Sequence, residues 1–255
     1  MNLLQSLVIA FSMYSKIPMP RVDWNEKNMK YAMCFFPVVG IVIGIITYII
    51  GNLLFLSSCN MLFRAVVLTL LPLLISGGIH MDGFMDTMDA LASYGDREKK
   101  LRILKDSHAG AFAIIGFGCY ALWSLAVWSQ VTAEMLGVIA GVFVLSRACS
   151  GFSIVTFPPA RADGLARTFQ DGAHKKRVAV IMMVFVFVFA FLMANADWKL
   201  ALGAFIVLVI VFHGYRRMAK KQFGGITGDL AGFFLQLAEL LMITGIVFAG
   251  GVLWS

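Results

Sequence analysis

Long runs of apolar residues, separated by short polar segments, dominate the sequence. Most of these runs have the length of about 20 residues that a helix needs to cross the hydrocarbon core of a bilayer. A shorter apolar stretch at 1–15 predicts a short apolar or interfacial helix. The predicted spans are 31–53, 62–79, 109–130, 134–157, 178–196, 199–215 and 229–252. The pattern therefore predicts an all-α, polytopic transmembrane helical bundle of about seven spans, within a range of six to eight.

Composition supports this fold class. Of the 255 residues, 60% are hydrophobic and 14% are charged, whereas soluble domains carry about 25% charged residues. The mean hydropathy is +0.85. These values exclude a soluble enzyme, a disordered tail and a secreted disulfide scaffold. The chain contains no internal repeat or low-complexity linker, so we expect a single integral membrane domain over 1–255.

The basic residues are distributed unevenly between the predicted loops. If the N-terminus lies in the cytoplasm, 18 of the 21 basic residues fall in cytoplasmic loops. These loops are 16–30, 97–105, 161–177 and 216–221. Such an asymmetry is typical of cytoplasmic loops, and it accounts for the net charge of +7 without a nucleic-acid partner. The lipid bilayer is the partner that this pattern predicts.

Three of the fourteen acidic residues lie within eight positions. Asp82, Asp86 and Asp89 have the spacing i, i+4 and i+7, which on a helix places them within about 60° of one another. Like charges at this spacing repel. Methionine and phenylalanine residues alternate with them, which favours a half-buried helix over a solvated helix end, the alternative interpretation. We therefore expect a cation on this face.

Carboxylates without paired cysteine or histidine favour a hard divalent cation, Mg²⁺ or Mn²⁺. Mg²⁺ bound by a few carboxylates usually completes its coordination with water and substrate phosphates. A phosphate-bearing substrate follows from this expectation. Gly83 would allow a phosphate or a neighbouring helix to approach the backbone closely.

Other polar residues stand at the ends of predicted spans. Lys105, Asp106, Ser107 and His108 precede the third long span, either as an N-cap or as phosphate or metal contacts at a helix N-terminus. His80 lies opposite Asp82 on an ideal helix, where it either supports the site or packs.

Arg147 lies inside a predicted span, where a charge is costly unless it is paired. It either neutralises an acidic residue, for which Glu239 is a candidate, or binds a phosphate. Gly228 and Asp229 follow further glycines at the start of the last span. They either cap that helix or form a phosphate-accommodating turn with a metal or sugar contact from Asp229.

The candidate residues at the predicted loops share one side of the membrane. Asp82 to Asp89, Asp106 to His108, and Asp229 all lie at cytoplasmic ends of spans in the proposed topology. This one-sided distribution favours a cytoplasm-facing active site. A transporter or channel would more often carry ionisable groups near the midplane.

Taken together, these segments resemble the cobalamin synthase family, the adenosylcobinamide-GDP ribazoletransferases. The resemblance covers essentially the whole chain. It is carried by segments 15–20, 36–44, 105–110 and 224–229, and most specifically by His-x-Asp-Gly-x-x-Asp-x-x-Asp at 80–89. The acidic segment is also similar in style to that of CDP-alcohol phosphotransferases. It lacks their Ala-Arg after Asp-Gly and their distal acidic repeat, so individual roles do not transfer from that group.

The resemblance implies a Mg²⁺-dependent membrane phosphotransferase of the cytoplasmic (inner) membrane. Its small-molecule substrates would be adenosylcobinamide-GDP and α-ribazole or its 5′-phosphate. The products would be adenosylcobalamin, or its 5′-phosphate, and GMP. This is the nucleotide-loop assembly step of vitamin B12 biosynthesis. A homo-oligomer or a corrin-assembly complex is compatible with the resemblance.

For this reaction, Asp82, Asp86 and Asp89 are the predicted metal ligands. Asp89 or His108 would take the proton from the attacking hydroxyl, with Asp89 slightly favoured. Predicted substrate-binding residues are His80, Gly83, Lys105, Asp106, Ser107, Arg147, Gly228 and Asp229. Arg147, Lys105 or Arg102 would balance the charge of the leaving nucleotide. The rival functions are a CDP-alcohol phosphotransferase, a transporter or channel, and a structural subunit.

Overall fold

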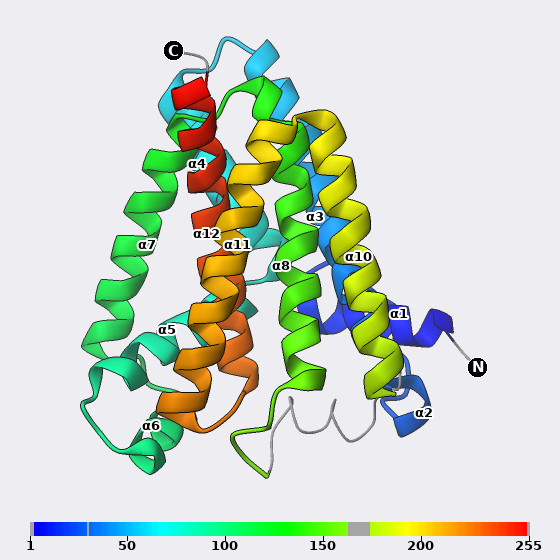
Figure 1. Cartoon of the computed structure of the whole chain (residues 1–255), viewed down its shortest axis with the longest axis vertical. Coiled ribbons are helices and arrows are strands. Elements are labelled where there is room, and N and C mark those ends of the chain that lie inside the picture. The colour runs from blue at the N-terminus through cyan, green and yellow to red at the C-terminus, as the bar shows by residue number, and fades with distance from the viewer. Residues whose placement is uncertain (1–2, 30, 163–173, 254–255) are drawn as a thin grey trace.

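The computed structural model describes residues 3–29, 31–162 and 174–253, and in this part of the chain it contains helices and no named strand. Lys30 and Arg167 of the charge map lie outside the described residues. The chain begins with a helix, α1, and a single helical turn, α2, and continues through the elements shown in Figure 1. Their bounds are α1 (Leu3–Tyr14), α2 (Glu26–Met29), η1 (Ala32–Phe35), α3 (Phe36–Leu56), α4 (Met61–Ser76), α5 (Ile79–Ala92), α6 (Arg97–Ile103), α7 (Ala111–Ser129), η2 (Ala133–Met135), α8 (Leu136–Thr156), α10 (Lys175–Ala196), α11 (Trp198–Met218), η3 (Ala219–Phe223) and α12 (Gly228–Leu253).

Six helical stretches of the described residues are long and apolar enough to cross a membrane, and the bent pair α4 and α5 makes a seventh if it is one span. The prediction of a polytopic helical bundle is confirmed. This is the architecture of a multi-pass membrane protein. The second predicted span, 62–79, differs from the structure because α4 ends at Ser76 and the chain then turns sharply.

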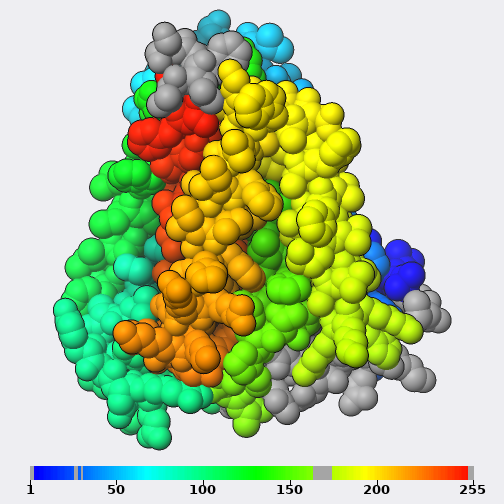
Figure 2. All heavy atoms as spheres, in the orientation of Figure 1, coloured from blue at the N-terminus to red at the C-terminus, as the bar shows by residue number. Residues whose placement is uncertain are grey.

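Two helices, α8 and α12, form the centre of the bundle. In the most apolar window of α8, 83% of the residues are buried, against 22% in α10. The outer helices instead expose large apolar side chains such as Phe187 and Ile210. Figure 2 shows α10 and α11 covering one face of the molecule. Because apolar residues face outward as well as inward, the surroundings of these helices are expected to be lipid.

The short first helix, α1, has 12 residues, too few to cross a bilayer. It packs through buried residues such as Ile9 and Phe11 into the main apolar core. In Figure 1 it lies across the lower part of the bundle rather than along the upright helices. The sequence prediction of a short apolar helix at 1–15 is therefore confirmed.

Candidate functional site

A sharp bend separates α4 from α5. Gly77 and Gly78 have φ angles of +67° and +77°, a left-handed conformation that glycine adopts without a steric penalty. The two helices consequently differ in direction by 96°. Helix α5 therefore crosses the lower part of the bundle, near α6 and the lower end of α7 (Figure 1). The bend brings the acidic segment beneath the upright helices.

Helix α5 presents its carboxylates on one face, as the spacing predicted. Asp82 is exposed, and Asp86 and Asp89 are half-buried. The other side of the helix is buried through residues that include Phe84 and Thr87. The phenyl ring of Phe84 stacks on that of Phe233 in α12, with centroids 5.4 Å apart. This packing fixes the rotation of α5 and hence the direction of its carboxylates.

The start of α12 lies against α5 at Gly83. A Cβ atom built on Gly83 would lie 2.7 Å from the carbonyl oxygen of Asp229 and 2.9 Å from its Cα atom. Thr227 caps α12, because its Oγ1 accepts a hydrogen bond from the Leu230 amide at 3.2 Å. The same hydroxyl lies 3.3 Å from the Asp229 carboxylate and donates to it. The glycine therefore allows Asp229 to join the carboxylates of α5.

Gly83→Ala should separate α5 from α12, because its methyl group would collide with backbone atoms that cannot rotate away. We expect lower activity and a Tm lower by about 3–10 °C, as for an overpacked core. Thermal unfolding of the detergent-solubilised protein measures this. In the control, Gly118→Ala on α7, the added methyl group meets no atom of the described residues within 4 Å, so its Tm should be unchanged or higher. Equal Tm values for the two variants would contradict the close approach.

The carboxylates are close enough to act on one another electrostatically. The negative charges of four other carboxylates lie close enough to repel that of Asp86. They belong to Asp82, Asp229, Asp89 and Asp106. Within the described residues, however, no three histidine, cysteine or acidic side chains form a compact metal-binding group. The arrangement is thus an open negative surface rather than a closed cage. It suits a cation that keeps water and substrate oxygens in its coordination shell.

Asp89 caps the start of α7. Its carboxylate accepts hydrogen bonds from the backbone amides of Gly110 at 2.6 Å and Ala113 at 2.9 Å. These amides have no partners within the helix, and a negative charge there is favoured by the helix dipole. The N-cap interpretation of Asp106 and Ser107 is therefore wrong, because Asp89 supplies the cap from α5. This pairing also fixes α5 to α7.

The segment before α7 forms a small exposed motif of its own. The Asp106 carboxylate accepts hydrogen bonds from the backbone amide of His108 at 3.0 Å and from its Nδ1 at 2.8 Å. These bonds lower the pKa of Asp106. Lys105, Ser107 and His108 are all exposed at this loop. The loop is near the carboxylate surface, because Gly110, two residues after His108, donates a hydrogen bond to Asp89.

His80 lies away from the carboxylates. Its ring is buried, with centroids 5.8 Å from Tyr14 and 5.6 Å from Phe36. Because α5 is helical from Ile79, the sequence geometry that put His80 opposite Asp82 applies. The structure favours the packing interpretation of His80 over direct contact with a substrate.

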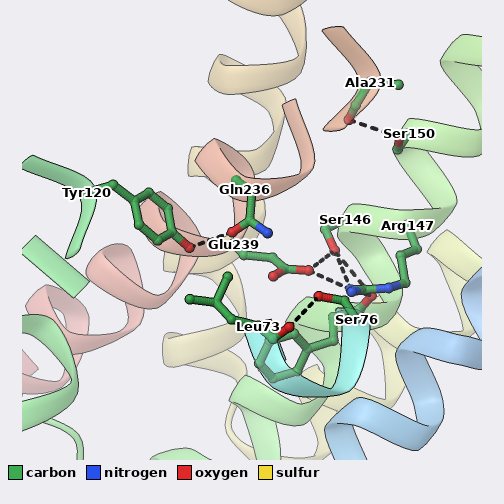
Figure 3. Close-up of polar contacts among 10 residues, drawn as sticks. Leu73, Ser76, Tyr120, Ser146, Arg147, Ser150, Ala231, Gln236 and Glu239 are labelled. Atoms are coloured by element: carbon green, nitrogen blue, oxygen red, sulfur yellow. Dashed lines mark hydrogen bonds and ion pairs between the residues drawn. The ribbon is translucent and has the colours of Figure 1, made fainter. Parts of the chain in front are cut away.

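Arg147 and Glu239 form an ion pair in the middle of the bundle, as Figure 3 shows. Both side chains are buried, at 1% and 4% exposed. Ser146 donates to the same carboxylate at 2.8 Å, and the carbonyl of Phe143 accepts from Arg147 at 3.0 Å. The predicted pairing with Glu239 is confirmed. The Nε of Arg147 has no partner among the described residues, but its Nη1 is held by these groups and its side chain is enclosed in the bundle. Its environment is therefore structural rather than that of a phosphate ligand.

Two arginines of the basic loops lie at the segments that meet before α12, and the charge of one of them, Arg161, acts on Asp229. Arg161 donates a hydrogen bond to the Leu101 carbonyl at 2.6 Å, and Arg97 donates to the Ala160 carbonyl at 3.2 Å. No motif marks either residue, because their proximity depends on contacts between segments about 60 residues apart.

Comparison with known proteins identifies the family to which the chain belongs. Residues 6–247 match the family described as Cobalamin-5-phosphate synthase. The chain is 45% identical to an adenosylcobinamide-GDP ribazoletransferase of Lachnoclostridium phytofermentans, over 99% of this chain and 97% of the relative. It is 34% identical to a protein of the same name from Clostridium perfringens strain 13, over 96% and 97%. No solved structure matches the chain. The chain therefore belongs to the Cobalamin-5-phosphate synthase family.

Proposed function

We propose that this protein is an adenosylcobinamide-GDP ribazoletransferase that performs the nucleotide-loop assembly step of vitamin B12 biosynthesis. The observation that carries the proposal is the match of nearly the whole chain to relatives of that name. The carboxylate surface formed by α5 and Asp229 supports it from the chemistry, since transfer between a diphosphate and a hydroxyl requires charge neutralisation and positioning.

The donor set of this surface fits Mg²⁺. Asp82 and Asp86 offer hard oxygen ligands from an open surface, and Asp229 adjoins them through Gly83. Mg²⁺ is commonly held by one or two protein carboxylates together with phosphate oxygens, so a compact group of three protein ligands is not required. When bound, the ion would neutralise the charge of the diphosphate. We propose Asp82 and Asp86 as its principal protein ligands.

In the proposed reaction, the 5′-hydroxyl oxygen of α-ribazole attacks the phosphorus attached to cobinamide. The bond from that phosphorus to the bridging oxygen breaks, GMP leaves with the bridging oxygen, and the hydroxyl loses its proton. We propose His108, rather than the slightly favoured Asp89, as the proton acceptor. Asp89 already receives two backbone amides, whereas Asp106 binds Nδ1 of His108 and leaves Nε2 for the substrate. Asp89 would then act by fixing α5 to α7.

We further propose that this site faces the cytoplasm from the inner membrane. The carboxylate-bearing helix α5 and the basic helix α6 lie together at the lower end of the bundle in Figure 1. The basic residues at the end of α11 lie there too. Basic loops mark the cytoplasmic side of membrane proteins. Both substrates would be reached from that side.

The proposal predicts metal-dependent formation of two products. The purified protein, given adenosylcobinamide-GDP, α-ribazole and Mg²⁺, should form adenosylcobalamin and GMP in equal amounts. Excess EDTA should abolish both, and added Mg²⁺ should restore them. Chromatography of the corrinoid and nucleotide products measures this. A folded protein that instead transfers a phosphoalcohol from a CDP-alcohol would favour the rival phosphotransferase, and activity undiminished by EDTA would contradict the role of the metal.

A further inference from the structure

Three segments are joined at the lower end of the bundle around the start of α12. The Ile226 amide donates to the Pro158 carbonyl, and the Ala160 amide donates to the Ile226 carbonyl, both at 2.9 Å. Arg97 at the start of α6 donates to the Ala160 carbonyl at 3.2 Å, and its guanidinium lies against Gly224. The segment after α8 is thus held between α6 and the turn that precedes α12.

This junction places Arg161 beside the carboxylate surface. Arg161 donates to the Leu101 carbonyl through one Nη atom, and its charge acts on the carboxylate of Asp229. The two side chains nevertheless form no ion pair within 4 Å in the described part of the chain. The buried Nε of Arg161 has no hydrogen-bond partner among the described residues. A guanidinium with an unused N–H group suits an anionic ligand of fixed geometry.

There is also space for such a ligand. Among the described residues, a Cβ atom on Gly228 would meet no atom within 4 Å, so this part of the structure leaves the position next to Asp229 open. Gly228 is the first residue of α12, a helix of 26 residues. The positive end of its dipole favours an anion there. Arg161 and Asp229 thus lie close to the same turn, next to the paired segments at 158–160 and 226, an arrangement that suits a phosphate ester and a bound cation together.

We propose that Arg161, with Arg97 beside it, binds the diphosphate group of the substrate at the start of α12. The identity of that diphosphate as part of adenosylcobinamide-GDP rests on the proposed function. The arginines replace Arg147 as the groups that balance the charge of the leaving nucleotide, because Arg147 is buried against Glu239. Carboxylates on α5 and guanidinium groups beside α12 would then contact the diphosphate from different sides.

Binding of inorganic pyrophosphate tests this assignment without requiring any reaction. Calorimetric titration of the purified protein, at one fixed concentration of Mg²⁺, should give a measurable Kd. Arg161→Gln should weaken it at least about tenfold, the loss expected for a charge-assisted hydrogen bond. The Kd of Arg161→Lys should lie between those of the wild type and Arg161→Gln, because lysine keeps the charge and lacks the planar guanidinium group. Arg217→Gln, at an exposed position in the last turn of α11, should bind as the wild type does.

An unchanged Kd in folded Arg161→Gln would overturn the proposal, as would a wild-type protein that does not bind pyrophosphate. If Arg161→Gln fails to fold, Arg97→Gln replaces it in the test, because a substitution of the exposed Arg97 should leave the fold intact. A weaker Kd for pyrophosphate in this variant would support the proposal, and an unchanged Kd would overturn it. The steady-state readout is the KM for adenosylcobinamide-GDP, which should rise while the KM for α-ribazole stays the same. If the wild-type protein binds pyrophosphate but performs no ribazole transfer, the proposed reaction is refuted and the anion site remains supported.

Discussion

Asp86→Asn should reduce ribazole transfer at least about a hundredfold, the loss typical of removing a major electrostatic contact to the transition state. Asparagine keeps the size of the side chain and removes its charge. Asp86 is half-buried on α5 and lies near other carboxylates. Removing its charge therefore relieves repulsion in the protein without metal or substrate. The free energy of unfolding should therefore stay the same or rise. Product formation and thermal unfolding of the same preparation measure the two effects.

Asp82→Asn should have a comparable effect on activity, since Asp82 lies one turn before Asp86 on the same face. The matched control is Asp23→Asn, which removes the charge of an exposed residue whose backbone carbonyl, and not its carboxylate, accepts the bond from Asn28. That variant should retain wild-type activity. Near-normal turnover in both α5 variants would refute the carboxylate surface as the reaction site.

Glu239→Ala should have the largest effect on stability. It would leave the guanidinium of Arg147, which is 1% exposed, without its counter-charge inside the bundle. Removing one partner of a buried ion pair costs about 3–5 kcal/mol, which corresponds to a fall in Tm of roughly 10 °C for a chain of this size. Differential scanning fluorimetry in detergent measures the change. Tyr120 and Gln236, which hydrogen-bond to each other nearby at 2.6 Å (Figure 3), should keep their contact.

The double variant Arg147→Leu/Glu239→Leu separates a structural role from a catalytic one. Replacing both members of a buried pair by apolar residues is often neutral or stabilising. The Tm of the double variant should therefore lie close to that of the wild type and above that of Glu239→Ala. Activity should also be close to that of the wild type, because neither residue contacts the proposed substrate. A stable double variant with a strongly raised KM for adenosylcobinamide-GDP would instead show that Arg147 binds the phosphate.

Local patterns in the sequence were sufficient for the spans other than 62–79 and for the acidic face. Both depend on helical periodicity, and Asp82, Asp86 and Asp89 are separated by whole turns of one helix. The predicted span 62–79 ran through the glycine pair at 77–78, and the bend of 96° there appeared only in the structure. Of the two alternatives for Asp106 and Ser107, the N-cap was wrong, because Asp89 reaches Gly110 from another helix.

Contacts between distant segments decided the other roles. His80 was compatible with support of the site or packing until Tyr14 and Phe36 were placed beside its ring. Arg161 carried no signal at all in the sequence, since its position near Asp229 depends on pairing of the segments at 158–160 and 226. Arg147 and Glu239 are 92 residues apart, and the cost of an unpaired charge was the only reason to connect them.

Electron paramagnetic resonance of Mn²⁺, used in place of Mg²⁺, tests the central claim most directly. In the wild-type protein with adenosylcobinamide-GDP, we expect bound Mn²⁺ with hyperfine coupling to the phosphorus atoms of the diphosphate. Asp82→Asn/Asp86→Asn should lose the bound signal, whereas Asp23→Asn should keep it. The same Mn²⁺ affinity and phosphorus coupling in the double variant would contradict the assignment of the carboxylate surface on α5 as the metal-binding reaction site.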